Sequence, residues 1–146
     1  MIRRILHASD FSSASRRAFA KAVELAKANR AELIVTHVLM PPVPLMVDGY
    51  ISPKAYADIE AAARREVQKR LAALVTRARR AGVRARALLL EGIAADRIVR
   101  AARSTRADLI VIGTHGRTGF TRMVLGSVAS RVISQAPCAV LTMRGR

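Results

Sequence analysis

Short apolar runs recur along the chain, and longer segments with apolar residues at helical spacing separate them. Runs rich in Val, Ile and Leu are typical of strands buried on both faces of a parallel sheet. They predict strands over residues 2–8, 32–38, 83–90, 109–112 and 139–143. The amphipathic segments between them predict helices over residues 13–29, 53–81, 93–105 and 128–135. Strands and helices are therefore expected to alternate strictly.

This alternation predicts an α/β fold. Strands that alternate with helices form a parallel sheet with helices on both faces, and right-handed crossovers leave few topologies for such a chain. Residues 1–146 have the length of one domain and contain no internal repeat, low-complexity tract or linker. We expect a single doubly wound domain with a five-stranded parallel sheet.

Capping and breaking residues support the helix bounds. Ser12 or Ser13 can accept hydrogen bonds from the first-turn N–H groups of the first helix. Pro53 suits the first position of the second helix, and Gly82 suits its C-terminal end. Residues 39–52 contain three prolines and a glycine and are predicted to form a loop. This loop is either a lid over a ligand or a plain surface excursion.

Composition restricts the core and the compartment. Hydrophobic residues make up 51% of the chain and aromatic residues only 3%, so the core must be aliphatic. The single cysteine, Cys138, cannot form an internal disulfide and is expected to be a small buried apolar residue in a reducing compartment. The N-terminal segment lacks the pattern of a signal peptide, and no apolar run reaches the roughly 18 residues that span a bilayer. We expect a cytoplasmic protein with no membrane partner.

The chain is strongly basic, with 26 Lys and Arg residues against 10 Asp and Glu residues and a formal net charge of +16. Such a charge can indicate binding to nucleic acid or to an anionic membrane. It can also belong to solvated helix faces, because the arginines are spread along the chain and cluster only in the helix predicted over 53–81. No interleaved aromatic residues or known DNA- or RNA-binding motif accompany them. We expect no specific nucleic-acid partner, and any non-specific binding should weaken steeply with salt.

Glycines gather between the fourth predicted strand and the fourth helix. Gly113 and Gly116 follow the strand, and Gly126 and Ser127 precede the helix. Such an arrangement can bind an anion, because glycine permits close backbone approach and the N–H groups at a helix start are unpaired. A flexible connection without a ligand would show the same local pattern. The sequence contains neither a Walker A loop nor a G-x-G-x-x-G fingerprint.

The spacing of these glycines resembles a family signature. Gly113-x-x-Gly116, nine residues and then Gly126-Ser127 resemble the G-2x-G-9x-G-[S/T] signature of the ATP-binding branch of the universal stress protein family. Residues 9–12 resemble the [ST]-D-x-S sequence that follows the family's first strand, although Ala8 stands where the family often has proline. Residues 37–38 resemble the H-V pair that ends its second strand. The resemblance covers the whole chain and implies the strand order 3-2-1-4-5, in which strands 1 and 4 border the ligand crevice.

The resemblance also implies a binding site for ATP or another adenine nucleotide. Asp10 would contact the nucleoside, and the backbone of Val38 would read the adenine edge. Mg²⁺ is expected to bind through the phosphates and not through a protein cage. Asp10 could instead serve only as the N-cap of the first helix. The site residues expected from the resemblance are Ala8, Ser9, Asp10, Val38, Ile112, Gly113, His115, Gly116, Arg117, Gly126, Ser127, Val128 and Ala129.

The pattern favours a binding module over an enzyme. Phosphoryl transfer requires a positioned metal and an oriented nucleophile, and only Asp10 and His115 offer an acid and a base at the expected crevice. We therefore expect a small nucleotide-binding regulatory or stress-response module, with slow ATP hydrolysis at most. A basic protein that binds nucleic acid non-specifically is the alternative.

The last predicted strand offers a surface through which two copies of the chain could associate. Residues 139–143 are expected at the sheet edge, where an apolar strand with unpaired backbone groups can pair with another chain. The family resemblance implies a homodimer in which this strand pairs antiparallel with its copy across a two-fold axis.

Overall fold

The structure is a computed structural model, and it describes residues 1–40, 52–114 and 125–145. Its elements follow the predicted order, and their bounds lie within two residues of the predicted ones. The loop predicted over 39–52 lies mostly outside the described residues, and Leu39 belongs to the preceding strand. The elements are β1 (Arg4–Ala8), α1 (Ser13–Asn29), β2 (Glu32–Leu39), α2 (Pro53–Arg80), β3 (Ala85–Glu91), α3 (Ala94–Ser104), β4 (Leu109–Gly113), α4 (Ser127–Gln135) and β5 (Ala139–Met143).

The five strands form one parallel sheet in the order β3-β2-β1-β4-β5, which confirms the predicted fold class and strand order. β1 is the central strand. Leu6 of β1 lies opposite Ile34 of β2 on one side and Ile110 of β4 on the other. β5 lies at one edge of the sheet, as the sequence predicts.

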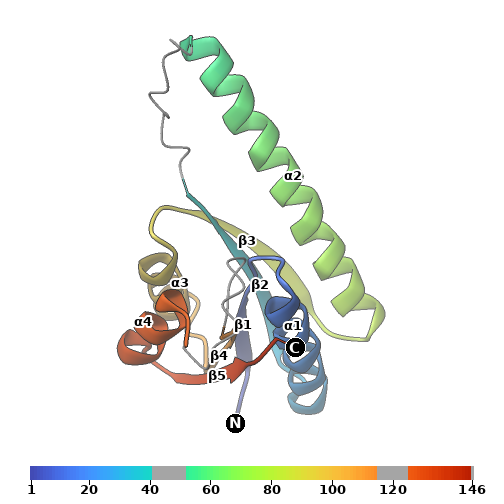
Figure 1. Ribbon diagram of the computed structural model, residues 1–146. Coiled ribbons are helices and arrows are strands. Elements are labelled where there is room, and N and C mark those ends of the chain that lie inside the picture. Colours follow the sequence, from blue (N-terminus) through green and yellow to red (C-terminus); the bar gives the residue numbers. More distant parts are fainter. Residues whose placement is uncertain (41–51, 115–124, 146) are drawn as a thin grey trace.

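Helices cover both faces of the sheet, with α1 and α2 on one face and α3 and α4 on the other (Figure 1). Successive strand residues point to opposite faces. Ile5 of β1 therefore packs into the core beneath α1 and α2, whereas Leu6 packs into the core beneath α3 and α4. This double burial is the reason why the central strands are continuous apolar runs.

The helix ends follow from local chemistry. The Oγ atom of Ser12 accepts a hydrogen bond from the N–H of Ser15 at 3.2 Å, so Ser12 is the N-cap of α1. α2 begins at Pro53 after the cap residue Ser52, and Gly82, with φ +84°, follows its C-cap. These bounds agree with the predicted capping residues. Among the residues that the structure describes, none of the helices combines the length and the hydrophobicity of a membrane span.

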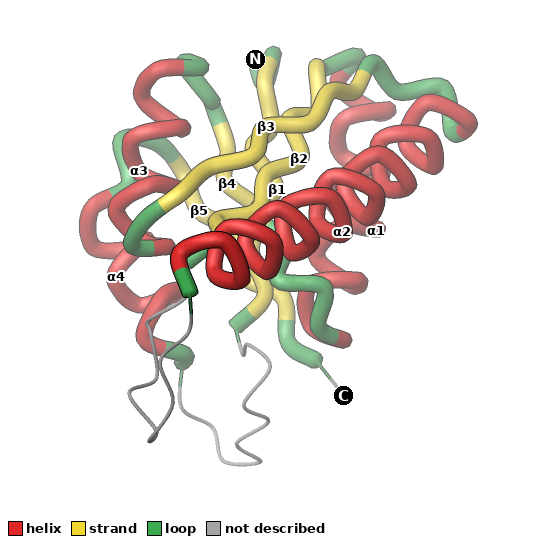
Figure 2. The backbone as a smooth tube through the Cα atoms, turned by 90° about the horizontal axis from the view of Figure 1, so that it is seen from above, coloured by secondary structure: helices red, strands yellow, loops and turns green. Residues whose placement is uncertain are grey.

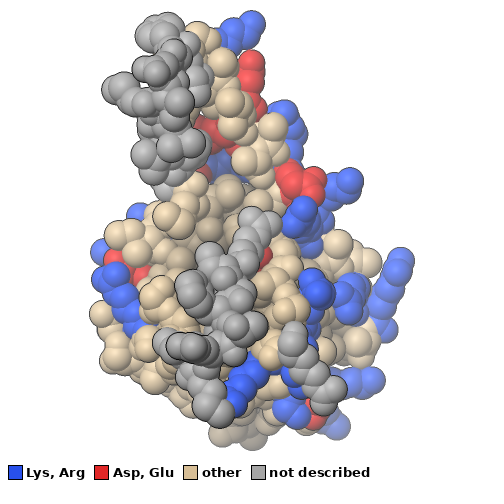
Figure 3. All heavy atoms as spheres, viewed as in Figure 1, with Lys and Arg blue, Asp and Glu red and all other residues tan. Residues whose placement is uncertain are grey.

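The N-terminal half of α2 extends beyond the sheet (Figure 1 and Figure 3). The apolar stripe of the helix is buried only in its second half, at Leu71, Val75 and Ala78. Ile59, on the same stripe, is 56% exposed. A helix of this length spans roughly 40 Å, whereas β3 spans roughly 23 Å, so the sheet cannot cover the whole helix.

A histidine is fully buried in the core beneath α1. The Nδ1 atom of His7 lies 3.0 Å from the carbonyl oxygen of Val111, and its ring lies against Phe19 with ring centroids 5.6 Å apart. A carbonyl can only accept, so Nδ1 carries the proton and Nε2 is unprotonated. Burial lowers the pKa of His7 from its ordinary value of 6.5 to about 4, outweighing the hydrogen bond to Val111. The burial of His7 is complete, with none of its surface exposed.

This burial predicts an acid-dependent stability. Between pH 6.5 and about 4, the unfolded chain binds a proton at His7 that the folded chain excludes. The free energy of unfolding should therefore fall by roughly 3 kcal/mol as the pH decreases through this window. Urea unfolding of the wild type and of His7→Gln at several pH values would measure the difference. A wild-type curve that parallels the His7→Gln curve from pH 7 to 4 would contradict this assignment.

Candidate functional site

The order in which the chain adds strands to the sheet reverses at its centre, between β1 and β4. β1 and β4 are neighbours, and β1 connects to α1 on one face while β4 connects to α4 on the other. In sheets of this kind, ligands bind outside the carboxyl ends of the strands at such a point. A cavity of about 240 Å³ lies there. It is at the end of the sheet where the C-terminus lies, and the N-terminus lies at the opposite end (Figure 2).

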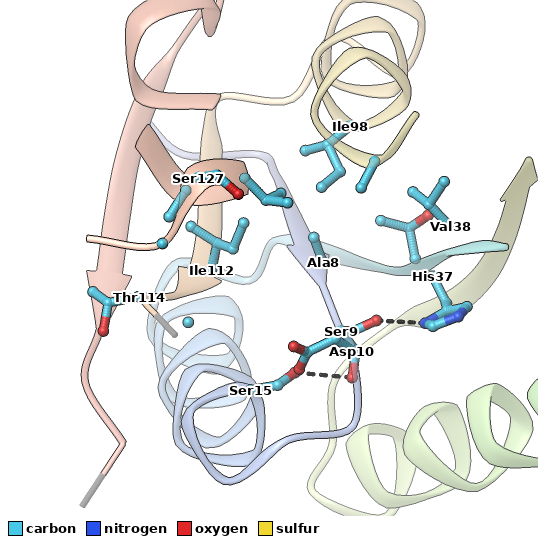
Figure 4. A pocket seen from close by; sticks show the side chains of 16 residues that line it. Ala8, Ser9, Asp10, Ser15, His37, Val38, Ile98, Ile112, Thr114 and Ser127 are labelled. Atoms are coloured by element: carbon cyan, nitrogen blue, oxygen red, sulfur yellow. Dashed lines mark hydrogen bonds between the residues drawn. The ribbon is translucent and has the colours of Figure 1, made fainter. Parts of the chain in front are cut away.

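The cavity has apolar walls and a polar floor. Ile98 of α3 and Val38 of β2 lie on one side, Ile112 and Ser127 on the other, with Ala8 of β1 between them (Figure 4). Ten of the thirteen residues expected from the sequence line the cavity: Ala8, Ser9, Asp10, Val38, Ile112, Gly113, Gly126, Ser127, Val128 and Ala129. The other three, His115, Gly116 and Arg117, lie outside the described residues.

Ser9 holds the floor of the cavity in place. Its N–H donates to the carbonyl oxygen of Thr36 at 2.8 Å, which continues the pairing of β1 with β2. Its Oγ atom accepts from the N–H of Phe11 at 3.2 Å and from the hydroxyl of Ser15 at 2.9 Å. These bonds connect β1, β2 and α1, so the turn after β1 is fixed at the position where a ligand would contact it.

Asp10 lines the cavity and shapes this turn. Its Oδ1 atom accepts a hydrogen bond from the N–H of Ser12 at 3.0 Å, two residues further along the chain. Ser12, and not Asp10, is the N-cap of α1, so the interpretation of Asp10 as only a helix cap is wrong. The carboxylate is half-buried in a cavity wall whose other described residues carry no negative charge.

His37 supports the same turn from the side of β2. The Nδ1–H of His37 donates to the carbonyl oxygen of Ser9 at 2.7 Å (Figure 4). Its ring stacks on Phe11 with ring centroids 4.9 Å apart. The guanidinium of Arg70, a residue of α2, lies 5.4 Å from the centroid of the Phe11 ring. Phe11 has a φ of 63°, an uncommon conformation for a bulky residue that this packing holds in place.

Several lining residues were not predicted as site residues: Ser15, Thr36, His37, Ala94, Ile98 and Thr114. Ala94 and Ile98 are one turn apart on the apolar side of α3, and the sequence indicated this side without indicating that it faces the site. The role of His37 depends on a bond to Ser9 across 28 positions, which no local pattern reveals.

The N-terminus of α4 opens onto the cavity. Its N-cap is Gly126, which has no side chain to accept from the first-turn N–H groups, in contrast to Ser12 at α1. The N–H of Gly126 itself donates to the carbonyl oxygen of Thr114 at 2.7 Å. The backbone of Ser127, Val128 and Ala129 therefore supplies the helix N–H groups at this wall. Such groups, at the positive end of the helix dipole, attract anions.

Gly113 has a packing reason to be glycine. A Cβ atom at this position would lie 3.0 Å from both the carbonyl carbon and the Cβ of Ala14. The end of β4 thus lies directly against the first turn of α1. The sequence suggested close approach of a ligand as the reason for this glycine, and the structure shows close approach of a helix.

Comparison with known proteins agrees with this geometry. The family model described as the universal stress protein family matches residues 1–144. A universal stress protein of Methanocaldococcus jannaschii is 36% identical over 99% of this chain and 83% of its own length.

Two solved structures share the fold and hold nucleotides. A universal stress protein in complex with cAMP has a TM-score of 0.69 and 25% identity, covering 99% of this chain and 98% of the other. The universal stress protein of Archaeoglobus fulgidus in complex with dAMP has a TM-score of 0.67 and 25% identity, covering 98% of each chain. The glycine spacing, the strand order and the match over nearly the whole chain lead to one conclusion: the chain belongs to the universal stress protein family.

Proposed function

We propose that this protein binds ATP or another adenine nucleotide in the crevice between β1 and β4 and acts as a regulatory module. The observation that carries the proposal is the uncapped N-terminus of α4 at the wall of a largely apolar cavity. An apolar cavity suits a flat base, and unpaired helix N–H groups suit phosphates. Two related structures contain cAMP and dAMP, which supports an adenine nucleotide.

The adenine would occupy the apolar part of the cavity. Ile98 and Ile112 come from opposite faces of the site and would enclose the ring. Val38 lies near the carboxyl end of β2, and its backbone groups can pair with the edge of the purine. Asp10, on the turn fixed by Ser9 and His37, can accept hydrogen bonds from ribose hydroxyls.

The phosphates would lie at the start of α4. The cavity volume of about 240 Å³ is below the 300–1,000 Å³ typical of pockets that enclose a drug-sized ligand. The base and sugar would therefore occupy the enclosed part, and the phosphates would extend to Ser127 and Val128 at its edge. Mg²⁺ would bridge the phosphate oxygens.

We propose binding without rapid turnover. Asp10 is the single carboxylate among the described residues that line the cavity, and its position at the turn suits the sugar and not the terminal phosphate.

We further propose that the protein works in the cytoplasm. Cys138 is partly buried, and this burial raises the pKa of its thiol, so the residue is not a reactive thiolate.

We also propose a homodimer formed through β5. This strand is at the sheet edge, and Val140, Leu141 and Met143 are partly exposed although apolar. Antiparallel pairing of two such edges would satisfy their backbone groups and bury these side chains.

The phosphate position can be tested at Gly126. Its φ of −58° and ψ of 151° are open to any residue, so Gly126→Val should fold, but its side chain would block the phosphates. Calorimetry should show no ATP binding to this variant. Ser127→Ala should weaken binding by about 1–3 kcal/mol, the scale of a hydrogen bond to a charged group. Ser130→Ala, one turn further along α4 and outside the cavity, is the control and should bind as the wild type does. ATP affinity in Gly126→Val equal to the wild type would exclude this phosphate site.

The nucleoside position can be tested separately at Asp10. Asp10→Ala should weaken ATP and adenosine to a similar extent, because its carboxylate is placed for the sugar. Inorganic triphosphate should bind Asp10→Ala as it binds the wild type, yet fail to bind Gly126→Val. Asp58→Ala on the exposed part of α2 is the control that removes a charge elsewhere. If Asp10→Ala lost triphosphate binding but kept adenosine binding, the proposed orientation of the ligand would be reversed.

The edge strand can be tested by proline. Adjacent residues in a strand direct their N–H groups to opposite sides. Proline has no N–H group, so one of the variants Val140→Pro and Leu141→Pro loses a hydrogen bond to β4. The other loses an N–H group that points away from the sheet. The variant at the outward position should stay folded and become monomeric in sedimentation at micromolar concentration. A wild type that is monomeric under these conditions would rule out the dimer.

A further inference from the structure

The end of the sheet opposite the crevice carries a dense group of basic residues. The strands are parallel and each helix returns antiparallel to them, so strands begin and helices end there. Segments 1–4, 27–32, 77–84 and 103–108 lie at this end and contain ten Lys or Arg residues, against the two acids Glu32 and Asp108. These short segments carry half of the formal net charge of +16.

Six exposed arginines form what we call the basic end: Arg3, Arg30, Arg80, Arg84, Arg103 and Arg106. Hydrogen bonds connect the segments that bear them. The guanidinium of Arg84 donates to the carbonyl oxygen of Arg30 at 3.2 Å, and that of Arg4 donates to the carbonyl oxygen of Thr105 at 3.1 Å.

The two acids at this end are already engaged. Glu32 lies between Arg86, at 2.8 Å, and Arg4, at 3.8 Å. Asp108 accepts hydrogen bonds from the backbone N–H groups of Arg3 and Arg4 at 2.7 and 2.9 Å, and these bonds lower its pKa. Within the described part of the chain, none of the six arginines forms an ion pair. Their charge is therefore available to a partner.

Helix stability accounts for only part of this arrangement, at residues such as Arg80 and Arg103 in the last turns of α2 and α3. A cation near a helix C-terminus is favourable, but Arg3 and Arg84 precede strands. Arg30 and Arg106 have φ values of 53° and 51°, the left-handed conformation in which glycine or asparagine is usual after a helix. The chain thus places arginine where another residue would suit the backbone better.

The chemistry of the basic end fits phosphate groups. The guanidinium group binds phosphate through paired hydrogen bonds. Met1 is the single large hydrophobic residue among the exposed ones described at this end, so neither a base-stacking platform nor a membrane-inserting face is present there. We propose that the basic end binds the phosphate backbone of double-stranded nucleic acid, independently of sequence and of the nucleotide crevice.

A charge-matched pair of variants tests this proposal. The first is Arg30→Gly/Arg84→Gln/Arg106→Gly, and the second is Lys54→Gln/Arg65→Gln/Lys69→Gln, which removes three exposed charges from α2. The probe is a fluorescent DNA duplex of arbitrary sequence, titrated at several salt concentrations and followed by anisotropy. The first variant should bind roughly tenfold more weakly or worse, and its salt slope should decrease by about 2.7, because three phosphate contacts are lost. Its melting temperature should change little, since glycine suits the left-handed positions and Arg84→Gln removes only one exposed hydrogen bond, to the carbonyl oxygen of Arg30.

The second variant should change duplex affinity by less than about twofold, and saturating ATP should leave duplex binding unchanged. Equal losses in the two variants would show that net charge alone acts, and would overturn the proposal. Displacement of the duplex by ATP would place the binding in the crevice instead. Binding to vesicles containing phosphatidylserine, without binding to the duplex, would identify a membrane as the partner and would also overturn it.

Discussion

The structure depends on the burial of β1 and β4 on both faces. Ile5 and Leu6 are fully buried on opposite sides of the same strand, as are Ile110 and Val111 in β4. Two layers of helices are needed to provide this burial, so the connections after β1 and β4 must leave to opposite faces. The space between them cannot be filled by either connection. The crevice thus results from the burial of β1 and β4 between two layers of helices. The polar groups around it belong to residues that end the strands and begin the helices.

The same parallel arrangement gives the molecule two chemically different ends. Helix N-termini lie at the carboxyl ends of the strands, where α4 begins at Gly126 without a side-chain cap. Helix C-termini lie at the other end, where the chain places arginines such as Arg30 and Arg106. One end therefore presents backbone N–H groups around a cavity, and the other presents exposed guanidinium groups. Both favour phosphate, but the first suits a small ligand and the second a long one.

The sequence predicted the sheet and helices closely, because alternation, caps and apolar runs act locally, as at Ser12 and Pro53. It also predicted ten residues that the fold brings to the cavity. It could not predict that α2 extends past the sheet, since the apolar stripe through Ile59 is the same whether or not a neighbour covers it. Nor could it predict contacts between distant segments, such as the bond from His37 to Ser9 and the packing of Gly113 on Ala14. Sequence periodicity reports which side of an element is apolar and not what lies against it.

The nucleotide site can be tested residue by residue with an amide spectrum of ¹⁵N-labelled protein titrated with ATP and Mg²⁺. The crevice would be the nucleotide site if the amides of Ser127, Val128 and Ala129 shift together with that of Val38, while those of Arg30 and Arg84 remain in place. The first group lies at the cavity and the second at the opposite end of the sheet. Shifts confined to the basic end, or no shifts at the cavity with millimolar ATP, would show that the crevice is not the nucleotide site.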